Sequence, residues 1–294
     1  MDTFFFLLFK SLETGSVYAL AALGIVLIFR TSSTTNFAQG SIGTLNAFVA
    51  AKLFIEWGWS IWAVAVVSML TAFITGILID TFIIRPASKV SPVSKQIITL
   101  GLIMVIIGLI PMIFGVDPLR IPRFINITES STIHLLGTTI THNAIFIITL
   151  SISLMGFLFW FLKYTRWGLA IRVTASNEVT SRLMGVPTKR VTMASWATAA
   201  AFGTLAALII APQSSVNVMM MSDVQVNAFF ACVLGGFGTF HGPVIGAYII
   251  AFSKSATQYY VDDVWGNVYV YIIILIFLFF KPFGLFGKKS ISKV

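Results

Sequence analysis

The sequence predicts an all-α fold, a polytopic bundle of transmembrane helices that forms one domain over residues 1–294. The chain is 57% hydrophobic and only 10% charged, whereas a soluble domain carries about 25% charged residues. Its apolar residues form long runs separated by shorter polar segments. Its cations give a formal net charge of +9 and gather at the ends of these runs, where lipid headgroups lie. This charge therefore indicates the lipid bilayer as its partner and not nucleic acid.

Nine of the apolar runs are predicted to be membrane spans, with eight or ten as alternatives. A hydrocarbon core about 30 Å thick requires about 20 apolar residues in a helix. The first, second and seventh runs are shorter, so we expect short or broken helices there. Residues 3–9 either extend the first run past Lys10 and Glu13 or form a separate interfacial segment. In chain order the runs are 16–29, 43–55, 61–84, 97–114, 143–162, 191–211, 226–240, 243–261 and 264–280.

The loops between the runs predict the orientation of the chain. Segments rich in Lys and Arg belong inside, and these are 85–95, 163–190 and the tail from residue 281. The opposite loops carry acids such as Glu56, Asp117, Asp223 and Asp262. This alternation predicts an external N-terminus and a cytoplasmic C-terminus. In the outer loop 115–142, Thr and Ile alternate between residues 131 and 141, which predicts a small β-hairpin or an irregular cap.

The inner loop 163–190 is too long and too varied for a simple turn between two helices. Asn177 or Ser176 is a suitable N-cap, Glu178 suits a first turn, and Gly185 is a good C-terminal stop. We therefore expect a short helix on the cytoplasmic surface that contacts a partner protein, with a solvated loop as the alternative. The loop has a single acid, Glu178, against six cations: Lys163, Arg166, Arg172, Arg182, Lys189 and Arg190.

Two further segments are unusual for membrane spans. Residues 31–41 are polar where the second run should begin, and their polar groups must be satisfied by protein or water. The segment is either a cytoplasmic loop with a helix cap or a broken helix that lines a pathway. The spacing of Gly238, Gly242 and Gly246 permits either tight helix packing or a role in a pathway wall or dimer seam. Glycine and alanine at the same spacing at residues 43, 47 and 51 suggest a weak internal repeat.

Several classes of protein are disfavoured by what the sequence lacks. The glycine-rich stretch at 235–242 has no Gly-Lys-Ser/Thr ending, so no nucleotide site is expected in this chain. The histidines are scattered and form no metal-ligand or catalytic pattern, so we expect neither a metal site nor an enzyme. Ionisable residues deep in the runs are nearly absent, which disfavours an ion-coupled carrier, and Lys254 is expected to point toward Asp262. The single Cys232 excludes an internal disulfide.

Motifs along essentially the whole chain resemble one family. They are Asn36-Phe-Ala-Gln-Gly40, Arg85-Pro86, Tyr164-Thr-Arg166-Trp-Gly168-x-Ala170-x-Arg172, Gly185-Val-x-Thr188-x-Arg190-Val191, Leu234-Gly-Gly-Phe-Gly238-x3-Gly242-x3-Gly246 and Lys281-Pro-Phe-Gly-Leu-Phe-Gly287. In this order they resemble the permease family of high-affinity branched-chain amino acid ABC transporters, and specifically its H-type subunit. The chain has Gln39 where the family commonly has His.

The resemblance implies an importer in the bacterial inner membrane that moves branched-chain or other hydrophobic amino acids. It implies a second, M-type permease or a homodimer, two ATPase subunits that use the ATP, and a periplasmic or extracellular solute-binding protein. This chain itself is expected to bind no cofactor. Urea or short amides are the alternative solutes, and a passive channel or an ion-coupled carrier is the alternative class.

Two groups of residues are expected to carry this function. The expected pathway residues are Asn36, Gln39, Gly40, Ser41, Asn46, Gly235, Gly236, Gly238 and Gly242. Those expected to couple to the ATPase are Arg166, Arg172, Asn177, Glu178, Arg182 and Gly185.

Overall fold

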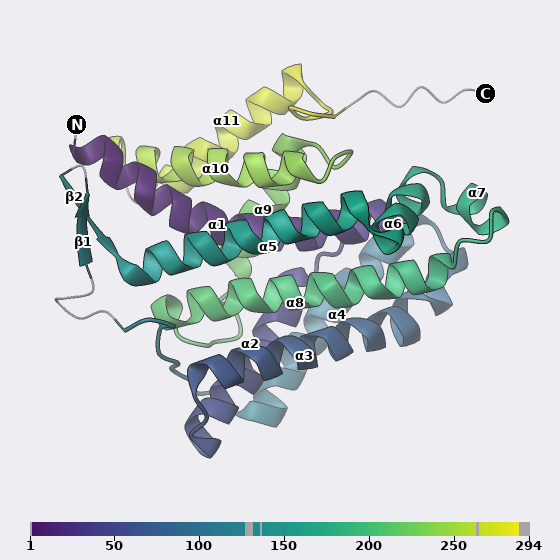
Figure 1. Cartoon of the computed structure of the whole chain (residues 1–294), viewed down its shortest axis with the longest axis horizontal. Helices are drawn as coiled ribbons and strands as arrows, with labels where there is room; N and C mark the ends of the chain where they lie inside the picture. Colours follow the sequence, from purple (N-terminus) through teal and green to yellow (C-terminus); the bar gives the residue numbers. More distant parts are fainter. Residues whose placement is uncertain (1, 127–131, 136, 263–264, 288–294) are drawn as a thin grey trace.

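The structure is a computed structural model that describes residues 2–126, 132–135, 137–262 and 265–287 (Figure 1). In this part of the chain it consists almost entirely of helices, which confirms the predicted all-α membrane bundle. The helices are α1 (Asp2–Ser32), α2 (Gln39–Trp57), α3 (Ile61–Ile79), α4 (Pro92–Phe114), α5 (His142–Tyr164), α6 (Arg166–Ser176), α7 (Glu178–Leu183), α8 (Thr188–Ser214), α9 (Ser222–Gly235), α10 (His241–Tyr260) and α11 (Gly266–Phe280).

Within the described ranges, five helical segments are long and apolar enough to cross a membrane: Thr3–Ser32, Ile61–Ile84, Pro92–Phe114, His142–Tyr164 and Thr188–Ser214. The other four predicted runs correspond to α2, α9, α10 and the shorter apolar α11. Residues 3–9 belong to the continuous helix α1, so the first run extends past Lys10 and Glu13. The predicted run 226–240 is wrong at its end, because α9 stops at Gly235 and Gly236 adopts a left-handed φ of 95°.

Local sequence signals define several helix ends. Ser60 and Ser91 each accept a hydrogen bond from the backbone N–H three residues on, and Pro92 follows Ser91 as the first residue of α4. These are ordinary N-cap arrangements. At its other end α3 continues into a π-helical turn, Asp80–Ile84, and then a 3₁₀ turn, Pro86–Lys89. The wider π turn points Asp80 inward, where its side chain is buried.

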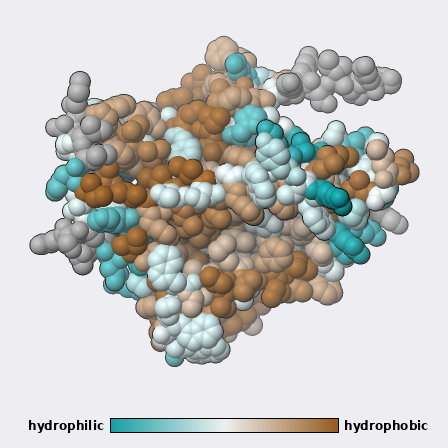
Figure 2. Space-filling model, in the orientation of Figure 1, coloured by the Kyte–Doolittle hydropathy of each residue, from teal (hydrophilic) through white to brown (hydrophobic). Residues whose placement is uncertain are grey.

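The core is centred on α1 and α8, whose most apolar stretches are 78% buried. Small residues make this possible, since α8 buries seven alanines between Ala197 and Ala211 and lets neighbouring backbones approach closely. By contrast, α3, α4 and α5 leave most of their apolar side chains partly or fully exposed. Figure 2 shows brown, apolar residues over much of the surface and the strongest teal toward its left and right edges. An apolar exterior of this kind is suited to contact with lipid.

The predicted loops gather at two opposite ends of the bundle (Figure 1). At one end, the start of α1 lies beside a hairpin of two antiparallel strands, β1 (Thr132–Leu135) and β2 (Thr138–Thr141), which confirms the predicted β-hairpin. The outer loop also pairs there with the 215–221 segment through Leu119 and Val216. At the other end lie the α3–α4 connection and the helices α6 and α7. The segment after α11 reaches this second end, because Phe286 contacts His241, which lies near Lys163 and Arg172.

Candidate substrate groove and coupling surface

The polar segment between α1 and α2 is a buried break between two helices. Asn36 and Gln39 have no solvent exposure. The Asn36 Oδ1 accepts a hydrogen bond from the Ala38 N–H at 3.0 Å, and its Nδ2 donates to Gln39 Oε1 at 3.2 Å. The first bond satisfies a buried backbone donor just before α2 and the second satisfies two buried side chains, as a break inside a membrane protein requires.

Gln39 connects α2 to α8 across the core. Its Nε2 donates to the carbonyl of Ala199 at 2.6 Å. The side chain fits between Gly24 of α1 and Gly203 of α8, where a Cβ would lie 2.4 Å and 2.7 Å from Nε2. A side chain at either place would force the Gln39 amide to move. Gln39 therefore fixes the packing of three helices and does not line an open space.

An apolar groove of about 300 Å³ begins one residue further on, and we call it the substrate groove. Its polar groups come from Ser41, Thr44, Ser222 and Gln225, and the rest of its wall is formed by hydrocarbon, aromatic and methionine side chains. A mostly apolar recess with a few polar groups is the usual form of a small-molecule site. The lining residues are Phe37, Gly40, Ser41, Thr44, Ile103, Met104, Ile107, Val218, Met219, Met221, Ser222, Gln225 and Val226.

Gln225 is a residue of this groove that was not predicted from the sequence. Its Oε1 accepts a hydrogen bond from the Gly40 N–H at 2.6 Å and so joins α9 to the first turn of α2. Its Nε2 is buried and has no hydrogen-bond partner among the described residues. An unsatisfied donor of this kind is costly, and a polar group of a bound solute would satisfy it. Its only sequence signal is an amide within the apolar stretch that follows Asp223.

The other expected pathway residues lie outside the groove. Asn46 joins α2 to α3, because its Oδ1 accepts a hydrogen bond from the Thr71 hydroxyl at 2.9 Å. Gly235 and Gly242 form the contact between α9 and α10, where a Cβ on Gly235 would lie 2.0 Å from the Gly242 carbonyl oxygen. Arg30 donates to the Gly238 carbonyl oxygen at the same junction. These glycines therefore pack helix ends together.

The segment after α11 completes this junction. The Leu285 and Phe286 N–H groups donate to the carbonyls of Leu234 and Gly235 at 2.8 Å and 3.2 Å. Gly236 and Gly284 both have positive φ and approach each other closely. The closing glycine-rich motif of the chain thus caps the end of α9.

Helices α6 and α7 form a surface at the end of the bundle opposite the hairpin, and we call it the coupling surface. The structure has two helices where the sequence predicted one, because the chain is extended at Asn177 between them. As expected, the Asn177 side chain caps α7, accepting from Thr180 N–H at 3.0 Å. Gly185 follows α7 with a φ of 81°. Arg166 is the first residue of α6, and Arg172 donates to the Lys163 carbonyl at 3.3 Å.

An apolar patch on α7 was not predicted. Val179, Leu183 and Met184 are 70%, 85% and 73% exposed. Glu178 and Arg182 flank them and form an exposed ion pair at 2.8 Å. Exposed apolar side chains with a charged rim are typical of a protein interface. The signal in the sequence is the four-residue spacing of Val179 and Leu183, about one helical turn, with Met184 directly after Leu183.

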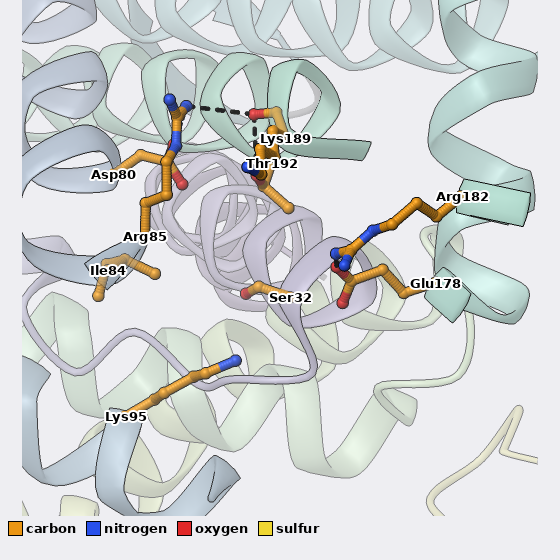
Figure 3. A pocket seen from close by; sticks show the side chains of 9 residues that line it. All are labelled: Ser32, Asp80, Ile84, Arg85, Lys95, Glu178, Arg182, Lys189 and Thr192. Atoms are coloured by element: carbon orange, nitrogen blue, oxygen red, sulfur yellow. Dashed lines mark hydrogen bonds and ion pairs between the residues drawn. The ribbon is translucent and has the colours of Figure 1, made fainter. Parts of the chain in front are cut away.

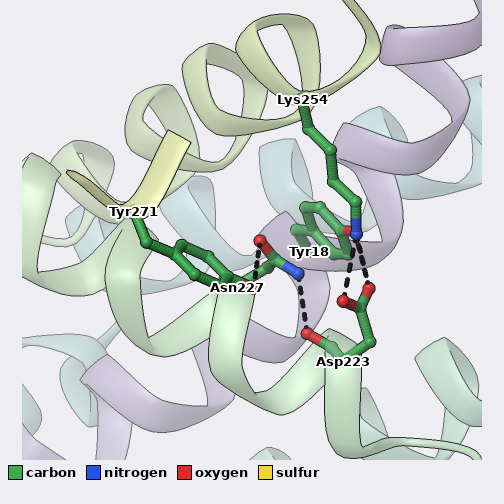
Figure 4. Close-up of polar contacts among 5 residues, drawn as sticks. All are labelled: Tyr18, Asp223, Asn227, Lys254 and Tyr271. Atoms are coloured by element: carbon green, nitrogen blue, oxygen red, sulfur yellow. Dashed lines mark hydrogen bonds and ion pairs between the residues drawn. The ribbon is translucent and has the colours of Figure 1, made fainter. Parts of the chain in front are cut away.

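A charged cluster where α1, α9 and α10 meet also differs from expectation (Figure 4). Lys254 does not reach Asp262. Its Nζ binds both carboxylate oxygens of Asp223, at 3.0 Å and 2.8 Å, and the Tyr18 hydroxyl donates to the same carboxylate at 3.1 Å. Asn227 then connects the backbone of Asp223 to the hydroxyl of Tyr271. Asp223 lies in the first turn of α9, so the ion pair and the Tyr18 hydroxyl together hold α1, α9 and α10 in contact. The cluster was not predicted because its members are far apart in sequence.

These features define a polytopic membrane protein of the permease class, with an apolar groove along its helices and an exposed helix at one end. Residues 7–279 match the family model of the branched-chain amino acid transport system / permease component, so the chain belongs to this family. It is therefore a transport permease component that works with an ATPase and with membrane-embedded partners, and it is not an enzyme.

Curated relatives match along almost their full length. The high-affinity branched-chain amino acid transport system permease protein LivH of Escherichia coli is 24% identical, and the match covers 98% of this chain and 96% of that protein. The protein BraD of the same description from Pseudomonas aeruginosa is 24% identical, with 98% and 97% covered. A probable LivH of Methanocaldococcus jannaschii is 26% identical, with 94% and 91% covered.

Proposed function

We propose that this chain is the H-type permease subunit of an ATP-driven importer of branched-chain or other hydrophobic amino acids. The observation that carries this proposal is the substrate groove, which is mostly apolar and has neutral polar groups at Ser41 and Gln225. Its hydrocarbon wall suits a branched aliphatic side chain. The hydroxyl and amide groups suit the polar end of an amino acid, since they add no fixed charge that the solute would have to displace.

The groove is a partly open recess in this chain, and a second membrane subunit would complete the pathway. An M-type permease or a second copy of this chain would supply the facing wall. Solute would come from a binding protein docked at the end that carries the hairpin and the 115–142 loop. Residues 163–190 would form the cytoplasmic coupling loop at the other end, in the bacterial inner membrane, with the C-terminus cytoplasmic.

The ATPase would bind the coupling surface through the apolar patch on α7. ATP binding and hydrolysis belong to that partner, and this chain holds no cofactor. Residues 184–187 join α7 directly to α8, so a displacement of α7 would move α8. In turn α8 contacts α2 at Gln39 and at the close approach of Gly43 to Gly203. Because α2 carries Gly40 and Ser41, this route connects the coupling surface to the groove.

Reconstitution would test the proposal. The complete complex is placed in proteoliposomes with binding protein and labelled leucine on the side of the hairpin and ATP on the side of α7. We expect leucine uptake that requires ATP and that excess urea does not inhibit. Uptake without ATP, or labelled urea carried in place of leucine, would overturn the proposal.

Cysteine labelling would test the orientation independently. Cys232 is fully buried, so Cys232→Ala gives a background without reactive thiols. On this background Thr139→Cys in the hairpin should react with an impermeant maleimide in intact cells, and Thr180→Cys on α7 only after permeabilisation. The reverse pattern would overturn the orientation and with it the direction of import.

A further inference from the structure

A second cavity, distinct from the substrate groove, lies at the end of the bundle that carries α7 (Figure 3). It has a volume of about 300 Å³. Its walls come from the end of α1, the π turn after α3, the first turns of α4 and α8, and α7. It shares no lining residue with the groove. We call it the cationic cavity, for the reason that follows.

Cations outnumber acids in its wall. Four basic side chains, Arg85, Lys95, Arg182 and Lys189, line it together with two carboxylates. Arg85 is paired with the carboxylate of Asp80 at 3.0 Å and Arg182 with that of Glu178 at 2.8 Å.

The two lysines are left over after this pairing. Among the described residues, neither Lys95 nor Lys189 has an acidic partner, and the buried Nε of Arg85 has no hydrogen-bond partner. Several unpaired donors of like charge around one space form a binding site for an anion.

Helix ends of both kinds meet at the cavity. Lys95 is the fourth residue of the 23-residue helix α4, and Lys189 is the second residue of the 27-residue helix α8. The positive ends of these two helices are opposed by the negative ends of α1 at Ser32 and of the π turn at Ile84, which line the same cavity. The attraction for an anion therefore comes from the two unpaired lysines and not from the helix dipoles.

The position of the cavity relative to the lipid bilayer identifies the source of the anion. Four of the apolar spans begin or end at its wall: one ends at Ser32, one ends at Ile84, and Pro92–Phe114 and Thr188–Ser214 begin next to Lys95 and Lys189. The cavity is therefore level with the boundary of the hydrocarbon, where phospholipid headgroups lie.

The helices beside the cavity present an apolar outer surface. Phe82 in the π turn is 72% exposed, and Val93 and Ile97 in the first turns of α4 are 63% and 62% exposed. These side chains suit contact with acyl chains at the place where a headgroup would enter. A soluble anion would have no use for this surface.

We propose that the cationic cavity binds the phosphate of an anionic phospholipid headgroup. Lys95 and Lys189 hold the phosphate, and the hydroxyls of Ser32 and Thr192 are further polar groups in the same wall. Two unpaired lysines favour a lipid with net negative charge over a zwitterionic one, whose choline group they repel. Assignment to the cytoplasmic leaflet rests on the proposed orientation, whereas the selection for anionic lipid does not depend on transport or on orientation.

Native mass spectrometry of the purified complex would test this proposal. The complex is equilibrated in micelles that contain equal amounts of phosphatidylglycerol and phosphatidylcholine, and the retained lipid is identified. We expect selective retention of phosphatidylglycerol by the wild type. Each lysine near an anionic lipid contributes about fivefold in affinity, so Lys95→Gln/Lys189→Gln should weaken retention about 30-fold. The matched control Lys281→Gln removes an exposed cation at the same end of the bundle, outside the cavity, and should retain the lipid as the wild type does.

Three results would overturn the proposal: no selection by the wild type, undiminished selection by the double variant, or an equal loss in the control. A further arm adds inorganic phosphate. If millimolar phosphate displaces the phosphatidylglycerol, the cavity is a site for a soluble phosphate and the lipid assignment is wrong. Should the double variant fail to assemble, the single variants and the phosphate arm still decide the question. A negative outcome leaves ATP-dependent uptake, and so the proposed function, unaffected.

Discussion

Gly43→Ala tests the contact between α2 and α8 on which both stability and the proposed coupling route depend. A Cβ at this position would lie 2.6 Å from the carbonyl oxygen and 2.9 Å from the carbonyl carbon of Gly203. Both atoms are backbone, so no side chain can move aside. To reach an ordinary contact of 3.4 Å, the two helices must separate by about 0.8 Å. Overpacking of this kind costs about 1–3 kcal/mol.

The change should lower the midpoint of thermal unfolding by about 2–6 °C for a chain of this size. It should also reduce ATP-dependent uptake, because α2 carries Gly40 and Ser41 of the groove. Thermal unfolding of the purified complex in detergent and uptake by proteoliposomes measure the two effects.

Gly101→Ala and Gly108→Ala are matched controls. Both lie in α4, and nothing lies within 4 Å of a Cβ at either position. Alanine is also the better helix former there. These variants should be as stable as the wild type or more so. A Gly43→Ala protein with unchanged stability would refute the close approach of α2 to α8.

Three further substitutions address other parts of the molecule. Lys254→Met leaves the half-exposed carboxylate of Asp223 without its cation. It should destabilise the complex by about 1–2 kcal/mol, less than the loss of one partner of a fully buried pair. Adding Asp223→Asn should restore part of the lost midpoint of thermal unfolding, and no recovery would mean that the pair is not the cause. Leu183→Glu on the exposed face of α7 should change stability by less than about 0.5 kcal/mol yet lower ATP-dependent uptake at least tenfold, and normal uptake would exclude this face as the ATPase contact. Ser41→Trp fills the groove, so leucine uptake should be lost although the complex still assembles and binds its ATPase. Full uptake would mean that solute passes elsewhere.

Features set by local sequence were predictable. The bundle follows from long apolar runs, the hairpin from alternating Thr and Ile, and the start and end of α7 from Asn177 and Gly185. Each depends on residues a few positions apart, and the corresponding hydrogen bonds in the structure are equally local. The division of the 163–190 loop into two helices was missed in part: Asn177 marks the break as an N-cap, but the residues before it were not recognised as a second helix, α6, which begins after the N-cap Thr165.

Features set by contacts between distant segments were not predictable in the same way. Asn36 and Gln39 were rightly singled out as polar groups that need partners, but only the fold reveals that Gln39 finds Ala199 and that Gly40 finds Gln225. Lys254 was given the nearest acid in sequence, whereas its partner Asp223 comes from the preceding helix. In a membrane each such polar group must be satisfied inside the protein. The sequence thus indicates where a partner is required, and the packing of α1, α2, α8, α9 and α10 decides which partner it is. By the same reasoning, Gln225 Nε2, a buried amide donor of the groove that the described residues leave unsatisfied, is where we expect a solute to make its polar contact.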